Sequence, residues 1–214
     1  MLPANARIVE CPYCGGTKEL LRLTSGNTFG ARYWSDRKQV APMLPQVSPV
    51  QKCPHCGKYY LGYKQKKREG DKHSSQLGTL SYPEWKEAYY QFLEEMENSD
   101  ERKQVVVEDI IYIHILLIQA YNDCYYRDGV AEPSAEEYTF IQGIIRDLID
   151  AIEWNDAEAL LQAELYREAN MMKECAEVLM LVDSATLNDV EKQVYESIKA
   201  RMERGETQVF EITM

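Results

Sequence analysis

The sequence predicts an α+β protein in which a small β-rich zinc ribbon is followed by an all-α bundle of helical hairpins. Two copies of a C-P-x-C-G motif lie at residues 11–15 and 53–57. Short β-type segments separated by turns surround these motifs. From residue 81 onward, apolar residues recur at helical spacing. We therefore expect a zinc-ribbon domain at 1–63, a basic linker at 64–80 and a tetratricopeptide-like helical domain at 81–214.

The two cysteine motifs predict a structural zinc site. Each motif places two thiols on one tight turn, and its glycine lets the chain reverse so that N–H groups approach the sulfurs. A redox C-x-x-C pair is the alternative, but it requires a single pair between a strand and a helix. Four thiolates leave no open coordination position, so Zn²⁺ here would be structural. The expected ligands are Cys11, Cys14, Cys53 and Cys56, whereas His55 is read as an exposed turn residue.

The 38 residues between Cys14 and Cys53 must contain strands of their own, since ribbon spacings are usually about 15–20 residues. We expect strands at 7–10, 19–23, 28–34 and 59–63, with a turn at 24–27. The proline-rich stretch 41–49 should be extended, because proline disfavours helix at the preceding residue. The basic run 64–72 interrupts all periodicity and reads as an exposed connector.

The charge is distributed unevenly. Residues 1–80 carry 13 Lys and Arg against 5 Asp and Glu, whereas residues 81–214 carry 11 against 30. A basic ribbon could attract nucleic acid, and an acidic helical body would repel it. The simpler explanation is that the two parts of the chain attract each other or face different surfaces of one assembly.

Six helices are expected in the second part. Ser81 and Glu84 form a capping box at the start of the first helix, and Ser134 with Glu137 repeats that pattern. Asp100 is the expected cap of a long apolar helix that ends at Asp128 and Gly129. That helix is expected at about 104–127, and the third at 135–153. The fourth starts at a cap formed by Asn155 or Asp156 and runs to 170. The fifth is expected at 171–182, and the sixth from 186 or 188 to 205. Residues 208–213 alternate and predict a strand added to the ribbon or a packed extension.

The isolated cysteines and histidine of the helical part have structural interpretations. Cys124 and Cys175 lie in apolar helical patterns and are expected to be buried free thiols. His114 is expected to be a core histidine, because no catalytic partner has a readable spacing to it. Zinc-type cysteine pairs together with isolated thiols favour a reducing cytoplasm, and no signal peptide or membrane span is visible.

One helical hairpin resembles a tetratricopeptide unit. Ala163, Tyr166, Asn170, Cys175 and Leu179 occupy its small, aromatic, turn, small and large apolar positions. The whole chain resembles a group of uncharacterised bacterial proteins that join a double-knuckle zinc ribbon to a tetratricopeptide-like domain. That resemblance rests on both cysteine motifs and on residues 30–36, 42–45 and 163–167. It implies no established activity. Arg37 stands where the resemblance leads us to expect glycine.

Residues 34–36, Trp-Ser-Asp, allow two interpretations. Ser35 and Asp36 can hydrogen-bond to the local backbone and shape a turn, with Trp34 packed over the zinc knuckles. Alternatively, an exposed Trp34 beside basic residues could grip a partner or stack on a base. The structural interpretation is favoured.

The sequence therefore favours a non-enzymatic, zinc-binding protein-interaction module. Helical hairpins offer a surface for a peptide, and the 15 tyrosines are of the type favoured at interfaces. A nucleic-acid-associated protein that uses the basic ribbon is the alternative. No nucleophile elbow, phosphate-binding loop or histidine-rich metal site supports an enzyme. The expected partner is a protein, and no membrane association is expected.

Overall fold

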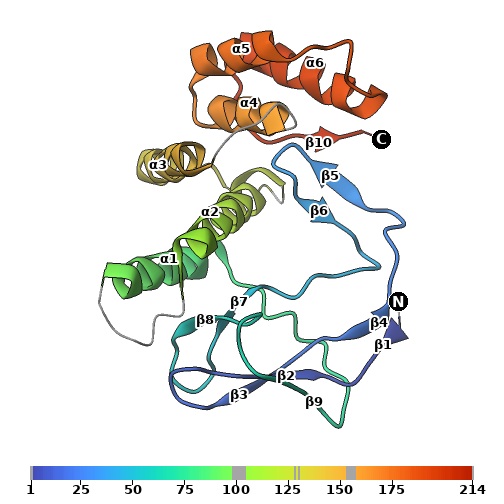
Figure 1. The fold of residues 1–214 in the computed structure, drawn as a ribbon, viewed down its shortest axis with the longest axis vertical. Coiled ribbons are helices and arrows are strands. Elements are labelled where there is room, and N and C mark those ends of the chain that lie inside the picture. The colour runs from blue at the N-terminus through green and yellow to red at the C-terminus, as the bar shows by residue number, and fades with distance from the viewer. Residues whose placement is uncertain (1, 98–104, 128, 130, 153–157, 214) are drawn as a thin grey trace. The chain divides into compact units, whose positions relative to one another are not determined.

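The computed structural model of the 214-residue chain describes residues 2–97, 105–127, 129, 131–152 and 158–213. It has the mixed α+β character that the sequence predicts (Figure 1). The chain forms two compact units. Unit 1 contains Met1–Ala31 and Val40–Ile110, and unit 2 contains Arg32–Gln39 and Ile111–Met214. This division differs from the expected boundaries at 63 and 81. The first helix, at 82–97, belongs to the same unit as the cysteine motifs, and the short hairpin at 32–39 belongs to the unit with the other helices.

The strands of unit 1 form small antiparallel sheets around the two cysteine motifs. Strand β2 lies between β3 and β9, β7 pairs with β8, and β1 pairs with β4. Their bounds are β1 (Leu2–Pro3), β2 (Arg7–Glu10), β3 (Thr17–Leu20), β4 (Leu23–Ser25), β7 (Val50–Lys52), β8 (Tyr59–Leu61) and β9 (Lys67–Glu69).

These strands match the expected ones in part. The strand at 7–10 is confirmed, and the strand expected at 59–63 ends at Leu61. The strand expected at 19–23 is divided, because β3 ends at Leu20 and β4 begins at Leu23. The run 64–72 contains β9, whose three residues are all exposed. Main-chain pairing with β2 does not require an apolar pattern, so the sequence carried no signal for this strand.

Helix α1 (Tyr82–Glu97) completes unit 1. It begins as the capping pattern predicts, since both the N–H and the hydroxyl of Ser81 donate to Glu84 Oε2, at 3.0 and 2.9 Å. Its predicted apolar face, which includes Trp85, Tyr89 and Phe92, is buried. The helix is therefore amphipathic, and its polar face remains available to the ribbon.

Unit 2 contains most of the helices and a three-stranded sheet in the order β10-β5-β6, with β10 antiparallel to β5. The predicted helices lie within the expected ranges. Their caps are confirmed at Ser134 and at Asn188, whereas Asp100, Asp128, Asn155 and Asp156 lie outside the described residues. The elements are β5 (Arg32–Trp34), β6 (Gln39–Val40), α2 (Val107–Asn122, which spans the unit boundary), a π-helical turn η1 (Asp123–Arg127), α3 (Ala135–Ala151), α4 (Ala159–Glu168), α5 (Met172–Leu181), α6 (Asp189–Glu203) and β10 (Glu211–Ile212).

Helix α4 is the centre of the helical core and packs against α3, α5 and α6. In the turn between α4 and α5, Asn170 has a positive φ. This left-handed conformation is one that asparagine tolerates. The apolar core at this hairpin consists of Ala163, Cys175, Leu179, Ile198 and Phe210. Among the described residues, no helix combines the length and the apolarity needed to cross a membrane.

Burial was predicted for Cys124, Cys175 and His114, and the structure confirms it for two of these three residues. Cys175 and His114 are buried, as expected. The prediction for Cys124 is wrong, because this thiol is exposed. Cys124 lies in the π-helical turn η1. The wider turn breaks the 3.6-residue period that placed Cys124 below Tyr121 on the apolar stripe.

The hairpin at 32–39 corrects the expectation for Trp34. The side chain is buried in unit 2, with the guanidinium groups of Arg32 and Arg127 at 5.0 and 5.2 Å from the ring centre, whereas both cysteine motifs belong to unit 1. Burial also contradicts the exposed, partner-gripping alternative. Asp36 shapes the turn as expected and accepts from the N–H of Lys38 at 3.2 Å. Arg37 has a positive φ, a conformation that glycine adopts most easily, and this gives a physical reason for the glycine that the resemblance leads us to expect here.

Candidate metal centre

The structure brings the four predicted cysteine ligands to one point. The Sγ atoms of Cys11, Cys14, Cys53 and Cys56 all lie within 4.8 Å of one another. Cys11 and Cys56 are 3.8 Å apart, and Cys14 and Cys53 are 3.6 Å apart. A tetrahedral zinc ion with Zn–S bonds of about 2.3 Å requires sulfur–sulfur separations of about 3.8 Å. The four cysteines therefore fit a metal ion, and no second group of this kind occurs in the described part of the chain.

Each cysteine motif forms the turn of a β-hairpin, and equivalent main-chain hydrogen bonds form in the two turns. The first hairpin is β2–β3 and the second is β7–β8. In the first, the N–H of Gly15 donates to the carbonyl of Cys11 at 2.9 Å, and in the second, Gly57 donates to Cys53 at 3.0 Å. Gly15 and Gly57 both have a positive φ, so glycine is needed at both positions. The repeated sequence therefore produces a repeated local structure.

Main-chain N–H groups approach the sulfurs, as predicted from the glycine positions. Gly16 donates to Cys14 Sγ and His55 donates to Cys53 Sγ, each at 3.4 Å. His55 is exposed and contributes this N–H rather than its ring. A Cβ atom on Gly16 would lie 2.3 Å from His55 Cδ2, so the two turns meet here. Sequence reasoning missed the role of Gly16, although its place directly after the first motif is a usable signal.

The electrostatic environments of the thiols differ. Burial raises the pKa of the Cys11 thiol to about 12. Burial also acts to raise the pKa of Cys53, but hydrogen bonds from the N–H groups of Cys56 and His55 and from the thiols of Cys14 and Cys11 outweigh it and lower this pKa to about 6. The cluster therefore stabilises a thiolate at Cys53, and a bound metal ion would displace the protons of the remaining thiols.

An apolar shell surrounds the inner half of the centre. Val9, Leu20 and Tyr60 pack with the buried Cys11 and Cys53, whereas Cys14 and Cys56 are exposed. Burial raises the pKa of the Tyr60 hydroxyl, and the nearby cysteines raise it further. The metal centre is thus also the centre of the ribbon's small core, as is typical of a structural site.

One glutamine of helix α1 binds the main chain of the second hairpin. The Gln91 side chain accepts from the N–H of Tyr59 at 2.9 Å and donates to the carbonyl of Tyr59 at 2.8 Å. Tyr59 is the first residue of β8, directly after the second cysteine motif. The Tyr59 hydroxyl also donates to Glu87 at 2.6 Å. Both the main chain and the side chain of Tyr59 are therefore held by α1.

The first cysteine motif has its own contact with α1. The hydroxyl of Tyr13, which lies between Cys11 and Cys14, donates to Glu95 at 2.6 Å. Burial and this hydrogen bond raise the pKa of Tyr13. The helix side of the interface thus uses positions 84, 87, 91 and 95, which share one helical face. Sequence reasoning missed this polar face, because acidic residues at helical spacing usually mark a solvated surface.

The fold and this site define a protein with four cysteines positioned to bind a metal ion, a helix packed on the hairpins that carry them, and a second unit that contains most of the helices. Comparison of the chain with protein-family models, with curated proteins and with solved structures finds no match in any of the three.

Proposed function

We propose that this protein is a structural zinc-binding, non-enzymatic protein-interaction module. The observation that carries the proposal is the cluster of four thiols, all within 4.8 Å of one another, at the turns of two hairpins. Zinc suits four thiolates better than the hard cations that prefer oxygen ligands. With four protein ligands the ion has no free position for substrate, so its role is to hold the two hairpins and α1 in place.

The interaction part of the proposal rests on the helical unit. The α4–α5 hairpin carries the tetratricopeptide-like pattern and its asparagine turn, which supports the proposed relationship to proteins that pair such a domain with a zinc ribbon. Unit 2 has 11 Lys and Arg against 22 Asp and Glu. Such a surplus of acidic residues keeps a surface soluble and favours protein partners over nucleic acid.

Binding of nucleic acid is the second candidate, and the exposed Lys67 and Arg68 of β9 favour it. The charge of unit 1 as a whole weakens it. With α1 included, unit 1 contains 13 Lys and Arg and 13 Asp and Glu. Glu84, for example, already pairs with Lys52 at 3.2 Å. The basic ribbon is therefore balanced within its own unit, and little field remains to attract phosphate.

Metal analysis and a binding assay test the two parts separately. Purified protein should contain about one zinc ion per chain, and Cys11→Ser should lose it. A protein that is folded and free of metal would contradict the first part. Binding to DNA or RNA should be absent at about 0.15 M salt. A sequence-selective complex that survives this salt concentration and is lost in a Lys67→Ala, Arg68→Ala variant would favour the second candidate.

A further inference from the structure

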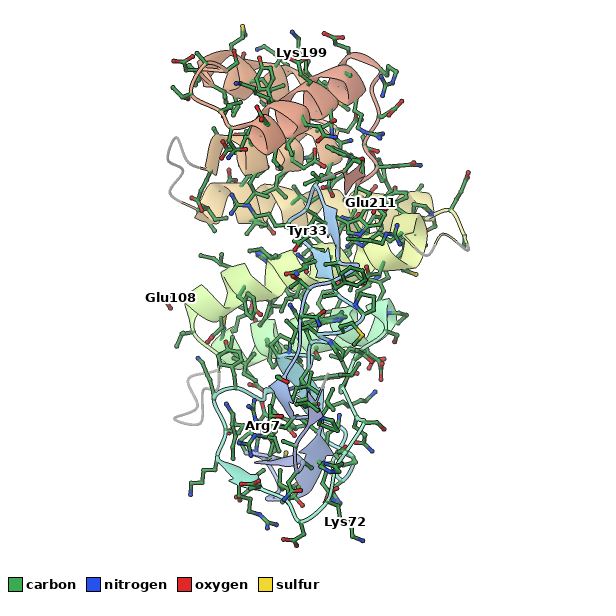
Figure 2. All side chains as sticks on the ribbon, turned by 90° about the vertical axis from the view of Figure 1, so that its right-hand side faces the viewer. Arg7, Tyr33, Lys72, Glu108, Lys199 and Glu211 are labelled. Carbon is green, nitrogen blue, oxygen red and sulfur yellow. The ribbon has the colours of Figure 1, made fainter. Side chains whose placement is uncertain are left out.

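Residues 206–212 follow α6, contain a bend at Gln208 and end in a short strand on unit 2. Gly205 has a positive φ and reverses the chain after the helix. The segment then ends in β10, which pairs antiparallel with β5, with Glu211 opposite Trp34 and Ile212 opposite Tyr33. Figure 1 shows β10 beside β5, and Figure 2 labels Tyr33 and Glu211 at this pair of strands. We call these residues segment 206–212.

Several polar contacts to segment 206–212 engage its main chain. The guanidinium group of Arg167, which is fully buried, donates to the carbonyls of Glu206 and Gln208, at 2.5 and 3.1 Å. The N–H of Ser35 donates to the carbonyl of Phe210 at 2.9 Å, and the Ser35 hydroxyl accepts from the N–H of Phe210 at 3.1 Å. Such contacts recognise an extended backbone without reading its side chains, as in strand addition to a sheet edge.

One aromatic side chain anchors the segment. Phe210 packs in the apolar core of the α4–α5 hairpin and α6. The guanidinium groups of Arg201 and Arg167 lie 4.6 and 5.5 Å from its ring centre. Val209 and Phe210 are buried, whereas the residues on either side of them are exposed or half-buried. An extended backbone with a single aromatic anchor is a mode of peptide recognition.

Three arginines pair with acidic side chains of the segment. They are Arg32, Arg201 and Arg204, whereas the charge of Arg167 is balanced by the buried Glu164 at 2.5 Å. Glu206 pairs with Arg204 and Arg201, at 2.5 and 2.8 Å, and Glu211 pairs with Arg32 at 2.6 Å. The surface is therefore complementary in charge to an extended acidic segment.

We propose that the surface formed by β5, Ser35, Arg167 and Arg201 is a peptide-binding site that segment 206–212 occupies within its own chain. Its partner in trans is an extended protein segment with an aromatic anchor flanked by acidic residues, the chemistry of Val209-Phe210-Glu211 and Glu206. The partner binds when segment 206–212 detaches. This inference rests on the proposed function, because it names the partner chemistry of the interaction module.

A labelled synthetic peptide of residues 206–213 tests the site in the full-length, zinc-loaded protein. In the unaltered chain its own segment competes at an effective concentration on the order of millimolar, so the peptide should bind weakly. Phe210→Ala removes the anchor of the chain's own segment. Fluorescence anisotropy should then show peptide binding at least about tenfold tighter than in the unaltered protein. Equally weak binding to both proteins, with the far-ultraviolet circular dichroism of the variant unchanged, overturns the proposal.

A charge exchange tests the position of the bound peptide. In the Phe210→Ala background, Arg32→Glu should weaken binding of the peptide about threefold, and a peptide with Glu211→Arg should recover it, as expected for an exposed ion pair. The matched control is Lys173→Glu, which makes the same charge change on the exposed face of α5 and should leave binding unchanged. An equal effect of Lys173→Glu, or no recovery with the altered peptide, contradicts the assigned site.

Hydrogen exchange in the unaltered protein covers the case in which Phe210→Ala does not fold. The amide hydrogens of Ser35 and Phe210 should exchange through local opening, faster than those within α4. Exchange of all these amides only through global unfolding would show a fixed segment and overturn the proposal. A doubled mass in light scattering, reversed by the peptide, would assign the site to a second copy and also overturn it. Either failure leaves the zinc analysis, and with it the proposed function, standing.

Discussion

Replacement of Gln91 by leucine tests the link between α1 and the metal centre. The Gln91 amide makes two hydrogen bonds, of 2.9 and 2.8 Å, to the main chain of the buried Tyr59. Leucine has a similar volume but leaves both main-chain groups without these partners. A buried main-chain group left without a partner costs about 1–3 kcal/mol. We therefore expect the free energy of unfolding of unit 1 to fall by about 2–4 kcal/mol.

The same loss should appear in zinc affinity, because the metal binds the folded ribbon rather than the unfolded chain. A loss of about 2 kcal/mol corresponds to a dissociation constant roughly 30-fold higher. Competition with a chromophoric chelator at fixed pH measures this change. Gln142→Leu is the control, since Gln142 donates to the carbonyl of Ala169 at 3.1 Å within unit 2 and should leave zinc affinity unchanged. If Gln91→Leu leaves both zinc affinity and urea stability unchanged, our assignment of α1 to the zinc-bound unit is refuted.

Three further predictions concern unit 2. Arg37 has a positive φ, a conformation that only glycine adopts without steric cost. Arg37→Gly should therefore modestly raise the free energy of unfolding, and Arg37→Val should lower it. A urea titration that gives the reverse order of stability would contradict this. Burial, then the negative charges of Glu164 and Asp36, raises the pKa of Glu168. The contribution of Glu168 to stability is therefore present below the unfolded carboxyl pKa and is lost as pH rises through the folded pKa. Glu168→Gln should remove this loss, and parallel curves of unfolding free energy against pH for the variant and the unaltered protein would refute the assignment. In zinc-loaded protein, Ellman's reagent should modify the exposed Cys124 before the buried Cys175, and equal rates would argue against the structure.

The local parts of the fold could be predicted from the sequence. The cysteine motifs carry their own geometry, because glycine, proline and two thiols within one short motif specify one kind of turn. The caps at Ser81, Ser134 and Asn188 located helix starts, because their hydrogen bonds join residues three positions apart. The positive φ of Arg37 was not predicted, although the resemblance led us to expect glycine at this position.

The long-range parts could not be predicted. The alternation at 208–213 predicted an added strand but not its pairing with β5, and nothing predicted the pairing of β9 with β2. These pairings use main-chain groups that leave no pattern in the sequence. The burial of Trp34 depends on Arg127, which lies in a π-helical turn that a 3.6-residue period does not anticipate. The polar face of α1 resembles a solvated surface until its partner Tyr59 is known.

X-ray absorption at the zinc edge tests the central claim most directly. If Cys11, Cys14, Cys53 and Cys56 hold one zinc ion, the spectrum of the purified protein should fit four sulfur neighbours at about 2.3 Å and no nitrogen or oxygen neighbour. Cys56→Ser should replace one sulfur by oxygen or abolish the signal. A fit with fewer than four sulfurs in the unaltered protein, or an identical spectrum in Cys56→Ser, would contradict a closed four-thiolate zinc site.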